Sequence, residues 1–442
     1  MDSVLAADLE RLTRDRQREW RSPGVSAAVV RDGSIAWSLG VGAADVAARD
    51  VAPDPDTAFA IGSISKTFTA SLIMQLRDEG KLALSDPVAR HIDVPAHGDL
   101  TIRELLAHAS GLQREPVGDL WDTLEVPDIA TVLSQLAEAE QVLPARRRWH
   151  YSNLAYSLLG EVVSRLDGRP WASALQARLL DPLGMTRTSL DPAGPRAVGY
   201  YTDPHTDQVS LEKWPDMAGF SSAGGLWSTA SDLARWVSFL GTGADGVLSA
   251  DTLDEMTRPE IMSDLEAWTL AWGLGLELFR RGERLLVGHE GAMPGFLACI
   301  AMRRADRVGS IVLCNTSAGA DPAALALDLV TTVLDASPPF AETWRPGPPV
   351  PAALAPLVGR WWSEGDSFTF SVRDGRLEAR KDSLPAGKPP AVFEPAGTDR
   401  YRTVSGREEG ELLLVERDES GAVARMRWAT YPFTRQPGTF GG

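Results

Sequence analysis

Cysteine is almost absent from this chain, with only Cys299 and Cys314 among its 442 residues. Two cysteines cannot form a disulfide framework, and such sparse use is typical of a reducing compartment. Both lie in apolar, strand-like runs. We therefore expect them to be buried, unreactive thiols.

Long apolar runs are also missing. No stretch reaches the roughly 18 apolar residues that a membrane-spanning helix needs. The first twenty residues carry charges throughout and contain neither the apolar centre nor the small-residue cleavage site of a secretory signal. These observations predict a cytoplasmic protein that does not act at a membrane.

Positively charged residues are fewer than negatively charged ones. The chain has 44 Lys and Arg and 60 Asp and Glu, which gives a net charge of −16. An acidic protein repels phosphate backbones, so nucleic acid is not an expected partner. The six histidines form no H-x-H or H-E-x-x-H pattern, and no G-x-S-x-G occurs. The lack of histidine metal-binding patterns argues against a metal site, and we expect no cofactor. The lack of G-x-S-x-G argues against an α/β-hydrolase.

The hydrophobic pattern predicts an α+β fold for residues 1–336. Strand-like runs lie near both ends of this region, at residues 25–30, 34–39, 284–287, 296–302 and 310–314. Helical periodicity or helix-start signals mark residues 4–20, 63–79, 154–166 and 322–334 and the segments that begin at Thr101 and Thr229. A central antiparallel sheet built from both chain ends and flanked by helices, with a further helical region, reconciles the pattern.

The chain changes character after residue 336. Proline clusters in residues 337–356 predict a semi-rigid linker. Beyond it, runs at residues 367–372, 376–380, 411–417 and 423–428 are all strand-like, with turns between them. We therefore expect a small antiparallel β-barrel or sandwich over residues 357–442.

The first candidate catalytic element is the S-x-x-K pattern of Ser63 and Lys66, directly before an apolar helix. Residues three apart on a helix can touch, so the amine can accept the serine proton once burial lowers its pKa. A serine cap followed by a surface lysine fits the isolated pattern equally well. Ser210 and Lys213 repeat it in a polar stretch without an apolar helix, and we interpret that second match as chance.

The second element is Tyr151-Ser152-Asn153, just before the helix predicted from residue 154. Tyr151 can share the proton transfer if the lysine ammonium lowers its pKa, and Asn153 offers a donor and an acceptor for a substrate carbonyl group. The alternative is a packed tyrosine at a helix start with Asn153 as the cap.

The third element is His289-Glu290-Gly291, which follows a strand-like run. Glycine at 291 lets a substrate lie close to the backbone. The backbone N–H groups of Ser63 and Ala292 can then form an oxyanion hole. Taken alone, His289 also fits a hydrogen-bonded structural histidine.

The order S-x-x-K, Y-x-N, H-x-G resembles the serine β-lactamase and penicillin-binding-protein-like family. This family includes class C β-lactamases, D-alanyl-D-alanine carboxypeptidases, D-aminopeptidases and related esterases. Further similarity lies in residues 60–70, 101–112, 151–160, 181–185 and 223–229. The resemblance covers about residues 5–335, and it implies the β-lactamase/transpeptidase-like fold.

The resemblance also implies a mechanism. Ser63 would attack a carbonyl group and become acylated, and Lys66 and Tyr151 would move the protons. Asn153 would contact the acyl side chain, and His289 to Gly291 would line the edge strand beside the substrate. The substrate class is then a small ester or amide, and the first hypothesis is a serine hydrolase. An acyltransferase of small-molecule biosynthesis uses the same chemistry, and a non-catalytic ligand-binding homologue is the third hypothesis.

One position departs from the family pattern. β-Lactamases and cell-wall peptidases of this type usually carry Lys-Thr-Gly where this chain has His289-Glu290-Gly291. The usual lysine and threonine help to bind a substrate carboxylate. The resemblance therefore favours an esterase, amidase or acyltransferase over a β-lactamase, a D-Ala carboxypeptidase or a D-aminopeptidase.

The tail from about residue 357 resembles the lipocalin-like barrel that follows the catalytic domain in some members. The similarity is carried by the strand pattern and by Val358-Gly359-Arg360-Trp361. Two interpretations stand side by side: a lid or specificity domain that reaches the active site, and a module for stability or oligomerisation.

Overall fold

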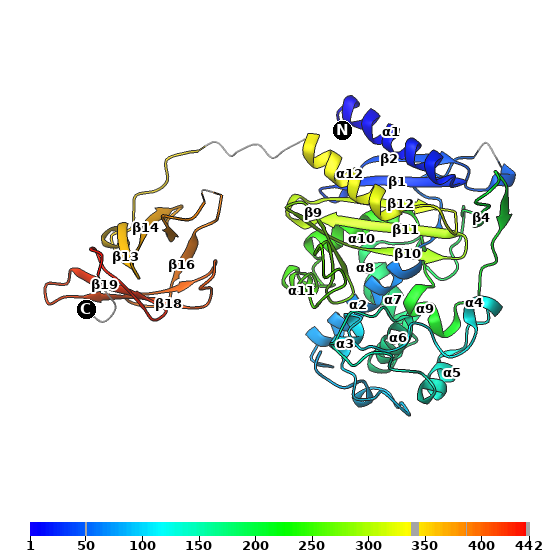
Figure 1. Cartoon of the computed structure of the whole chain (residues 1–442), viewed down its shortest axis with the longest axis horizontal. Helices are drawn as coiled ribbons and strands as arrows, with labels where there is room; N and C mark the ends of the chain where they lie inside the picture. The colour runs from blue at the N-terminus through cyan, green and yellow to red at the C-terminus, as the bar shows by residue number, and fades with distance from the viewer. Residues whose placement is uncertain (49–50, 337–343, 386, 439–442) are drawn as a thin grey trace. The chain divides into compact units, whose positions relative to one another are not determined.

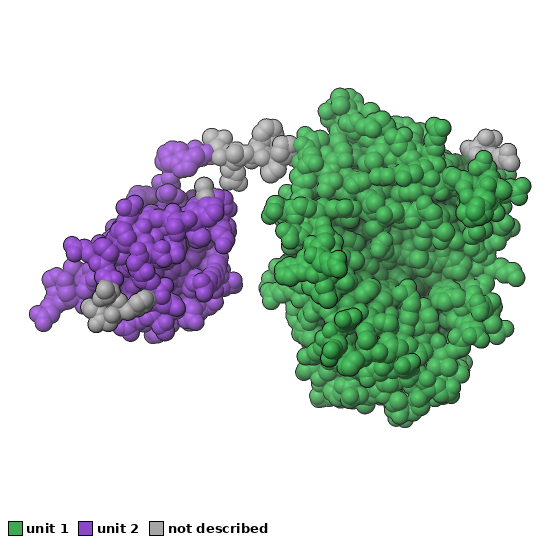
Figure 2. Space-filling view, in the orientation of Figure 1, with its two compact units in different colours: residues 1–338 green, residues 339–442 purple. Residues whose placement is uncertain are grey.

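The chain forms two compact units, residues 1–338 and 339–442 (Figure 2). The computed structural model describes residues 1–48, 51–336, 344–385 and 387–438. Residues 337–343 of the predicted linker lie outside the described residues. The rest of that segment contains no strand or α-helix before the 3₁₀ turn η8 (Ala355–Leu357).

The first unit is built on one large antiparallel sheet. Among the described residues it has eight strands in the order β2-β1-β12-β11-β10-β9-β8-β7. The strands are β1 (Gly24–Arg31), β2 (Ser34–Gly42), β7 (Ile261–Met262), β8 (Leu270–Trp272), β9 (Glu277–Arg281), β10 (Arg284–Met293), β11 (Phe296–Arg303) and β12 (Val308–Cys314). Strand β1 pairs with β12 from Val25 opposite Cys314 to Arg31 opposite Val308. The prediction of a sheet made from both ends of the chain is confirmed.

Helices cover both faces of this sheet. Helices α1 (Ser3–Trp20) and α12 (Pro322–Ala336) pack together on one face, as Figure 1 shows, and α10 (Ala230–Thr242) packs on the other. The apolar stripe of α1 includes Leu5 and Leu9, which are buried in one cluster with Leu325 and Leu329 of α12. Burial of these amphipathic faces fixes the positions of the outer helices.

A helical region lies beyond α10. Its helices are α2 (Ser65–Asp78), α3 (Ile102–Leu106), α4 (Leu120–Thr123), α5 (Ile129–Ser134), α6 (Asn153–Asp167), α7 (Trp171–Leu175), α8 (Asp181–Leu183) and α9 (Ser221–Gly224). Helix α11 (Ala250–Met256) follows α10 and contacts it. The short strands form two separate pairs, β3 (Phe59–Ala60) with β6 (Trp227–Ser228) and β4 (Tyr200–Thr202) with β5 (Val209–Leu211). The predicted capping box is present at α3, where the Thr101 side chain accepts from the N–H of Glu104 and the Glu104 carboxylate accepts from the N–H of Thr101.

Helix α2 differs from its prediction in burial. The periodicity indicated one apolar face, whereas every residue from Ser65 to Leu76 is buried. The reason is that α2 contacts α6, α7 and α9 as well as the 3₁₀ turn η2 (Gly62–Ile64) that precedes it. A central helix of this kind buries polar side chains, Lys66 among them, as well as apolar ones.

The second unit is a sequential antiparallel meander. Within the described part of the tail it contains eight strands: β13 (Gly359–Ser363), β14 (Asp366–Arg373), β15 (Arg376–Lys381), β16 (Ala391–Pro395), β17 (Arg400–Thr403), β18 (Leu412–Arg417), β19 (Val423–Trp428) and β20 (Tyr431–Phe433). Trp362 and Thr434 exchange backbone hydrogen bonds of 2.8 and 3.0 Å, so the first and last strands nearly close a barrel. The predicted barrel is confirmed, and the four short strands β13, β16, β17 and β20 are added to it.

The two cysteines lie where the sequence predicted. Both are buried free thiols on paired strands, Cys299 on β11 and Cys314 on β12. Burial raises the pKa of both thiols, which disfavours the reactive thiolate. Among the described helices, none is long and apolar enough to cross a membrane. No group of three or more His, Cys, Asp or Glu side chains in the described residues is arranged to hold a metal ion.

Candidate active site

Ser63 lies in the 3₁₀ turn η2 (Gly62–Ile64), two residues before α2 begins. The prediction placed Ser63 within the first turn of the α-helix, but the tighter turn still brings the two side chains together. Ser63 is half-buried and Lys66 is fully buried, and Lys66 Nζ lies 3.1 Å from Ser63 Oγ.

Two further contacts complete the environment of Lys66. Nζ donates to Asn153 Oδ1 at 2.6 Å and to the carbonyl of Ala223 in α9 at 2.7 Å. Both atoms are acceptors only, so they use both hydrogens of a neutral amine. The remaining lone pair is then available to Ser63, and a neutral Lys66 can accept the proton of the Ser63 hydroxyl.

The electrostatics favour this neutral form. Burial lowers the pKa of Lys66 well below its usual value of 10.5, and the Glu115 carboxylate opposes that shift only in part. A charged ammonium without water is unstable, and the protein supplies no direct ion pair to it among the described contacts.

Tyr151 lies beside this amine. The ring of Tyr151 has its centroid 4.9 Å from Lys66 Nζ and stacks on His108 at 4.2 Å. Burial raises the pKa of Tyr151, and a hydrogen bond with Ser63 opposes this rise only in part. The expectation of a tyrosine pKa lowered by the lysine is therefore wrong, because Tyr151 is itself buried and burial disfavours the phenolate. Tyr151 is a protonated donor in the resting site.

Asn153 is the first residue of α6, and the helix cap is Ser152 rather than Asn153. Its amide is held at both ends, since Oδ1 accepts from Lys66 and Nδ2 donates to both carboxylate oxygens of Glu115, at 2.9 and 3.1 Å. These contacts fix the orientation of the amide. In this arrangement Asn153 connects Lys66 to Glu115.

Glu115 is a site residue that sequence reasoning missed. The loop that carries it is docked on the start of α6, where the carbonyl of Arg114 accepts from the N–H of Asn153 at 2.7 Å and that of Gln113 accepts from Ser152 Oγ at 2.8 Å. The Arg114 guanidinium lies 4.8 Å from the centroid of the Tyr151 ring. The Glu115 side chain is 19 % exposed, so its carboxylate is reachable from solvent. The sequence around Glu115 carries no motif, and only the fold brings it to Asn153.

The segment His289-Glu290-Gly291 belongs to β10, which continues to Met293 instead of ending near residue 287 as the sequence pattern indicated. Strand β9 pairs with β10 only as far as Gly288. Residues 289–293 therefore form an open stretch of strand edge beside the nucleophile turn, with which β10 is in contact.

Gly291 has a structural role that the sequence did not indicate. A Cβ atom at residue 291 would lie 2.0 Å from the carbonyl oxygen of Ile61 and 3.4 Å from the nitrogen of Ser63. A Cβ atom at Gly62, whose φ is +50°, would lie 2.7 Å from the nitrogen of Ala292. The space beside Gly291 is thus filled by the protein's own main chain, and glycine is needed so that the nucleophile turn can approach β10. This approach puts the nitrogens of Ser63 and Ala292 on facing backbone segments.

His289 is 1 % exposed and faces the same cluster as Tyr151. Burial, with a smaller contribution from Lys66, lowers the pKa of His289 to about 3. His289 is consequently an uncharged imidazole at neutral pH.

This burial predicts an acid dependence of stability. Unfolded histidine takes up a proton near pH 6.5, whereas folded His289 resists it until about pH 3. The unfolded state therefore binds more protons in this window, and the free energy of unfolding falls as the pH decreases. We expect His289→Gln to remove up to about 1.4 kcal/mol per pH unit of that slope.

Urea titrations between pH 4 and 7 measure the effect. The exposed His205 provides the matched control. Burial also lowers the pKa of His108. His108 therefore adds to the dependence of the unfolding free energy on pH in the same direction, and this contribution remains in the His289→Gln variant. Equal slopes for the His289→Gln and His205→Gln variants would contradict the assignment.

The second S-x-x-K match lies away from this geometry. Ser210 is in the short strand β5, and both Ser210 and Lys213 are exposed on a hairpin without a helix. It remains, as predicted, a chance match.

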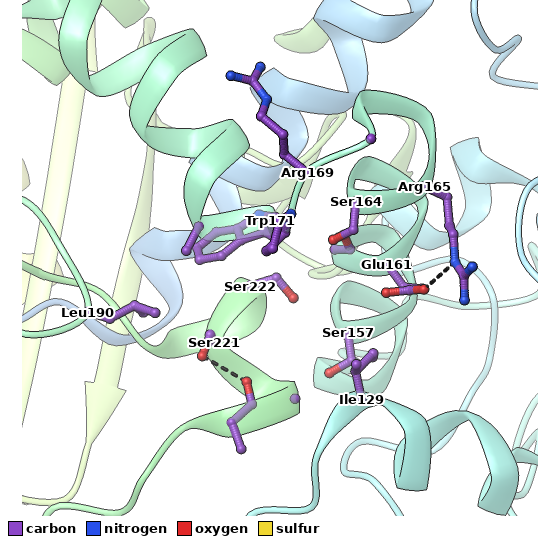
Figure 3. A pocket seen from close by; sticks show the side chains of 16 residues that line it. Ile129, Ser157, Glu161, Ser164, Arg165, Arg169, Trp171, Leu190, Ser221 and Ser222 are labelled. Carbon is purple, nitrogen blue, oxygen red and sulfur yellow. Dashed lines mark hydrogen bonds and ion pairs between the residues drawn. The ribbon is translucent and has the colours of Figure 1, made fainter.

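A cavity of about 630 Å³ lies next to residues that contact the site but is separate from the site itself. It runs along α6, α7 and α9, and Figure 3 shows Trp171 and Leu190 around Ser222. None of the predicted site residues lines it. Ser222 nevertheless connects the two regions, because its carbonyl accepts from Thr69 Oγ1 at 2.8 Å and the next carbonyl, that of Ala223, accepts from Lys66.

Comparison with known families identifies the class. Residues 9–334 match the family model described as beta-lactamase, and the chain belongs to the beta-lactamase family. Residues 350–435 match a model described as a domain of unknown function, DUF7586. The predicted family and fold are thereby confirmed for the first unit.

Curated relatives span most of the chain. An unguisins hydrolase of Aspergillus campestris is 28 % identical over 461 residues, covering 95 % of this chain and 81 % of its own length. Penicillin-binding protein 4 of Amycolatopsis lactamdurans is 30 % identical, covering 78 % and 95 %. A D-aminopeptidase of Brucella anthropi is 25 % identical, covering 95 % and 78 %. These relatives support a family of hydrolases that act on amides or esters.

Solved structures share the fold. The octameric penicillin-binding protein homologue from Pyrococcus abyssi aligns with a TM-score of 0.66 at 23 % identity, covering 97 % of this chain and 99 % of its own. D-amino acid amidase from Ochrobactrum anthropi aligns with a TM-score of 0.64 at 23 % identity, covering 76 % and 98 %.

Proposed function

We propose that this protein is a serine hydrolase that cleaves an amide or ester through an acyl-Ser63 intermediate. The observation that carries the proposal is the 3.1 Å contact between Ser63 Oγ and the fully buried Nζ of Lys66. Asn153 and Ala223 accept two hydrogens of this amine, so once Lys66 is neutral its lone pair faces the Ser63 hydroxyl. A nucleophile needs such a base beside it.

In the first half-reaction, Ser63 Oγ attacks the carbonyl carbon while its proton moves to Lys66. The N–H groups of Ser63 and Ala292 stabilise the resulting oxyanion, each worth about 2.7–4 kcal/mol in comparable sites. The bond to the leaving group then breaks. Tyr151 protonates the leaving amine or alkoxide and regains a proton from Lys66.

In the second half-reaction, water attacks the acyl-Ser63 carbonyl, again with proton removal by the base. The acid product leaves and the Ser63 hydroxyl is restored. A small-molecule amine or alcohol in place of water gives acyl transfer, so the acceptor decides between the hydrolase and the acyltransferase.

Glu115 favours an aminopeptidase-type substrate within this chemistry. Its carboxylate contacts Asn153 and, at 3.4 Å, Nε of Arg114. Because the carboxylate is partly exposed and the Arg114 side chain is largely in solvent, it can also pair with the free α-ammonium group of an amino-terminal residue. The D-aminopeptidase among the relatives agrees with such a substrate.

We expect Glu115→Gln to weaken this recognition, because glutamine keeps the contact with Asn153 but loses the charge. The measured quantity is the ratio of kcat/KM for D-alanine p-nitroanilide to kcat/KM for its N-acetylated form. This ratio should be about 10–100-fold lower in Glu115→Gln than in the wild type. The N-acetylated substrate controls for changes at Lys66. A ratio that is the same in wild type and variant would exclude Glu115 as the ammonium partner.

Mass spectrometry of the acylated protein tests the proposed function. A p-nitrophenyl ester, quenched in acid during turnover, should add one acyl mass to the peptide that contains Ser63. The peptide containing Ser210 should carry none. Label absent from Ser63, or present on another residue of an active enzyme, would refute the mechanism. Adding amines during turnover and measuring amide product then gives the partition between water and other acceptors.

A further inference from the structure

His108 is a buried histidine that the proposed mechanism does not use. It lies in the turn that follows α3, it is fully buried, and its φ angle is +54°. A left-handed backbone is unfavourable for a residue with a Cβ atom, and it persists only where the surrounding structure holds it. Burial lowers the pKa of His108 well below its usual value of 6.5, so the imidazole is uncharged at neutral pH.

His108 contacts three consecutive residues of the segment that carries Tyr151. Its backbone carbonyl accepts from the N–H of His150 at 2.9 Å, and its Nδ1 atom accepts from the N–H of Ser152 at 3.1 Å. Its ring stacks on the ring of Tyr151, with 4.2 Å between the centroids and 24° between the planes. The main chain is therefore held on both sides of Tyr151, while the stacking contact orients the phenol ring.

The hydrogen bond from Ser152 also determines the tautomer of His108. A backbone N–H can only donate, so Nδ1 carries the lone pair and the proton of the neutral ring is on Nε2. The imidazole has two further aromatic neighbours. Trp272 packs edge-on against it at 4.7 Å, and the ring centroid of Tyr156 lies 5.2 Å away. These neighbours fix the imidazole, which can in turn fix Tyr151.

The proposed chemistry requires Tyr151 at a defined position. Its hydroxyl has a hydrogen bond with Ser63, and its ring centroid lies 4.9 Å from Lys66 Nζ. Proton transfer needs heavy atoms within about 2.6–3.2 Å of each other. A displacement of about 1 Å can slow a reaction by about 10²-fold. Because residues 149–152 have no regular secondary structure, the position of Tyr151 depends on contacts from outside this segment.

We propose that His108 is a positioning residue for Tyr151, which holds the phenol hydroxyl within hydrogen-bond distance of Ser63 and of the leaving group. The contacts of His108 with the residue before Tyr151, with Tyr151 itself and with the residue after it carry this inference. The inference rests on the proposed function, because it concerns the proton transfer assigned there to Tyr151. His108 acts through Tyr151 and takes no part in the bond changes.

The dependence of turnover on the leaving group separates positioning from packing. An ethoxide leaving group needs the proton of Tyr151, whereas p-nitrophenolate is stable as an anion and needs none. The informative quantity is the ratio of kcat/KM for ethyl butyrate to kcat/KM for p-nitrophenyl butyrate, which have the same acyl group. A displaced Tyr151 lowers this ratio, while a general loss of structure lowers both rates and leaves the ratio unchanged.

Two variants of His108 test the contacts. His108→Gly removes the ring and Nδ1 but suits the left-handed backbone, and we expect the ratio to fall by at least about 10-fold. His108→Asn tolerates the same backbone and returns an acceptor to the N–H of Ser152, so its ratio should be at least about 3-fold higher than that of His108→Gly. A wild-type ratio in His108→Gly would overturn the inference, and so would a ratio in His108→Asn no higher than in His108→Gly.

Tyr151→Phe is the reference for these variants. It removes the hydroxyl and should lower the ratio by about 10²-fold or more. If His108 acts through Tyr151, adding His108→Gly to Tyr151→Phe should lower the ratio no further. Losses that add in the double variant would give His108 an effect of its own and overturn the inference.

Tyr156→Phe is the matched control for a general disturbance of this cluster. The Tyr156 hydroxyl donates to the carbonyl of Leu106 at 2.8 Å, so the variant removes a buried hydrogen bond beside His108 but leaves both contacts of His108 with the Tyr151 segment. We expect its ratio to equal that of the wild type. A fall as large as that of His108→Gly would assign the effect to packing and overturn the inference.

The wild-type protein distinguishes failure of this inference from failure of the proposed function. If acyl-Ser63 forms with neither ester, the proposed function is overturned. If it forms with p-nitrophenyl butyrate while ethyl butyrate is not cleaved, Tyr151 does not protonate leaving groups and this inference falls alone. Nuclear magnetic resonance of ¹⁵N-histidine-labelled protein adds a readout independent of turnover. We expect the ring of His108, assigned with His108→Asn, to be neutral with its proton on Nε2 at pH 7, and a proton on Nδ1 would overturn the inference.

Discussion

Replacing Ser63 with alanine is expected to lower kcat/KM for p-nitrophenyl butyrate by about 10⁴-fold or more. Removal of a serine nucleophile has effects of this order because no other group can form the acyl intermediate. The Ser63 hydroxyl contacts Lys66 and Tyr151, and Ser63 is only half-buried. The fold should therefore survive, and the melting temperature should stay within about 2 °C of the wild type.

Ser210→Ala is the matched control for this prediction. It removes the same hydroxyl from the second S-x-x-K match, at an exposed position, and should leave turnover unchanged. Initial rates and thermal melts of the three proteins measure both expectations. Full activity in Ser63→Ala would assign the nucleophile to another residue.

Replacing Lys66 is expected to have an effect of similar size. Lys66→Met fills the same buried space but cannot accept the Ser63 proton, and we expect kcat/KM to fall by about 10³–10⁴-fold. The carbonyl groups of Asn153 and Ala223 also lose their donor. We therefore expect some loss of stability, about 1–3 kcal/mol for each buried group left without a partner.

Lys66→Arg distinguishes a base from a cation. Arginine retains positive charge at every accessible pH and cannot act as the base. We expect it to be as inactive as Lys66→Met, while the exposed Lys213→Arg behaves as wild type. In the wild type, kcat/KM should rise with pH as Lys66 loses its proton, and the lowered pKa moves this rise well below pH 10.5. Substantial activity of Lys66→Arg would mean that the lysine acts by its charge.

Local patterns predicted most of the architecture. Asp32-Gly33 joins β1 to β2 with φ angles of +47° and +86°, and Asp374-Gly375 joins β14 to β15 with +48° and +77°. Two consecutive left-handed residues are what a two-residue hairpin requires, so the sequence signal is direct. The short strands of the barrel gave weaker signals, since three to five residues establish little alternation.

The candidate site was predictable only in part. Ser63 and Lys66 are neighbours along the chain, so their contact follows from helical geometry. Glu115 reaches the site through the docking of a distant segment, and it belongs to no motif. The pKa of Tyr151 was predicted in the wrong direction because burial, which opposes charge on every nearby group, cannot be read from Tyr151-Ser152-Asn153 alone.

The close approach of the two backbone segments that carry Gly62 and Gly291 separates two properties that enzymes often couple. The proposed oxyanion hole is made of main-chain groups on two backbone segments that touch without side chains between them. Side chains around it, such as those of Glu115 and His289, can therefore change in evolution without moving the hole. Substrate preference can drift in this scaffold while the catalytic centre stays rigid, whereas any side chain added at Gly62 or Gly291 alters both at once.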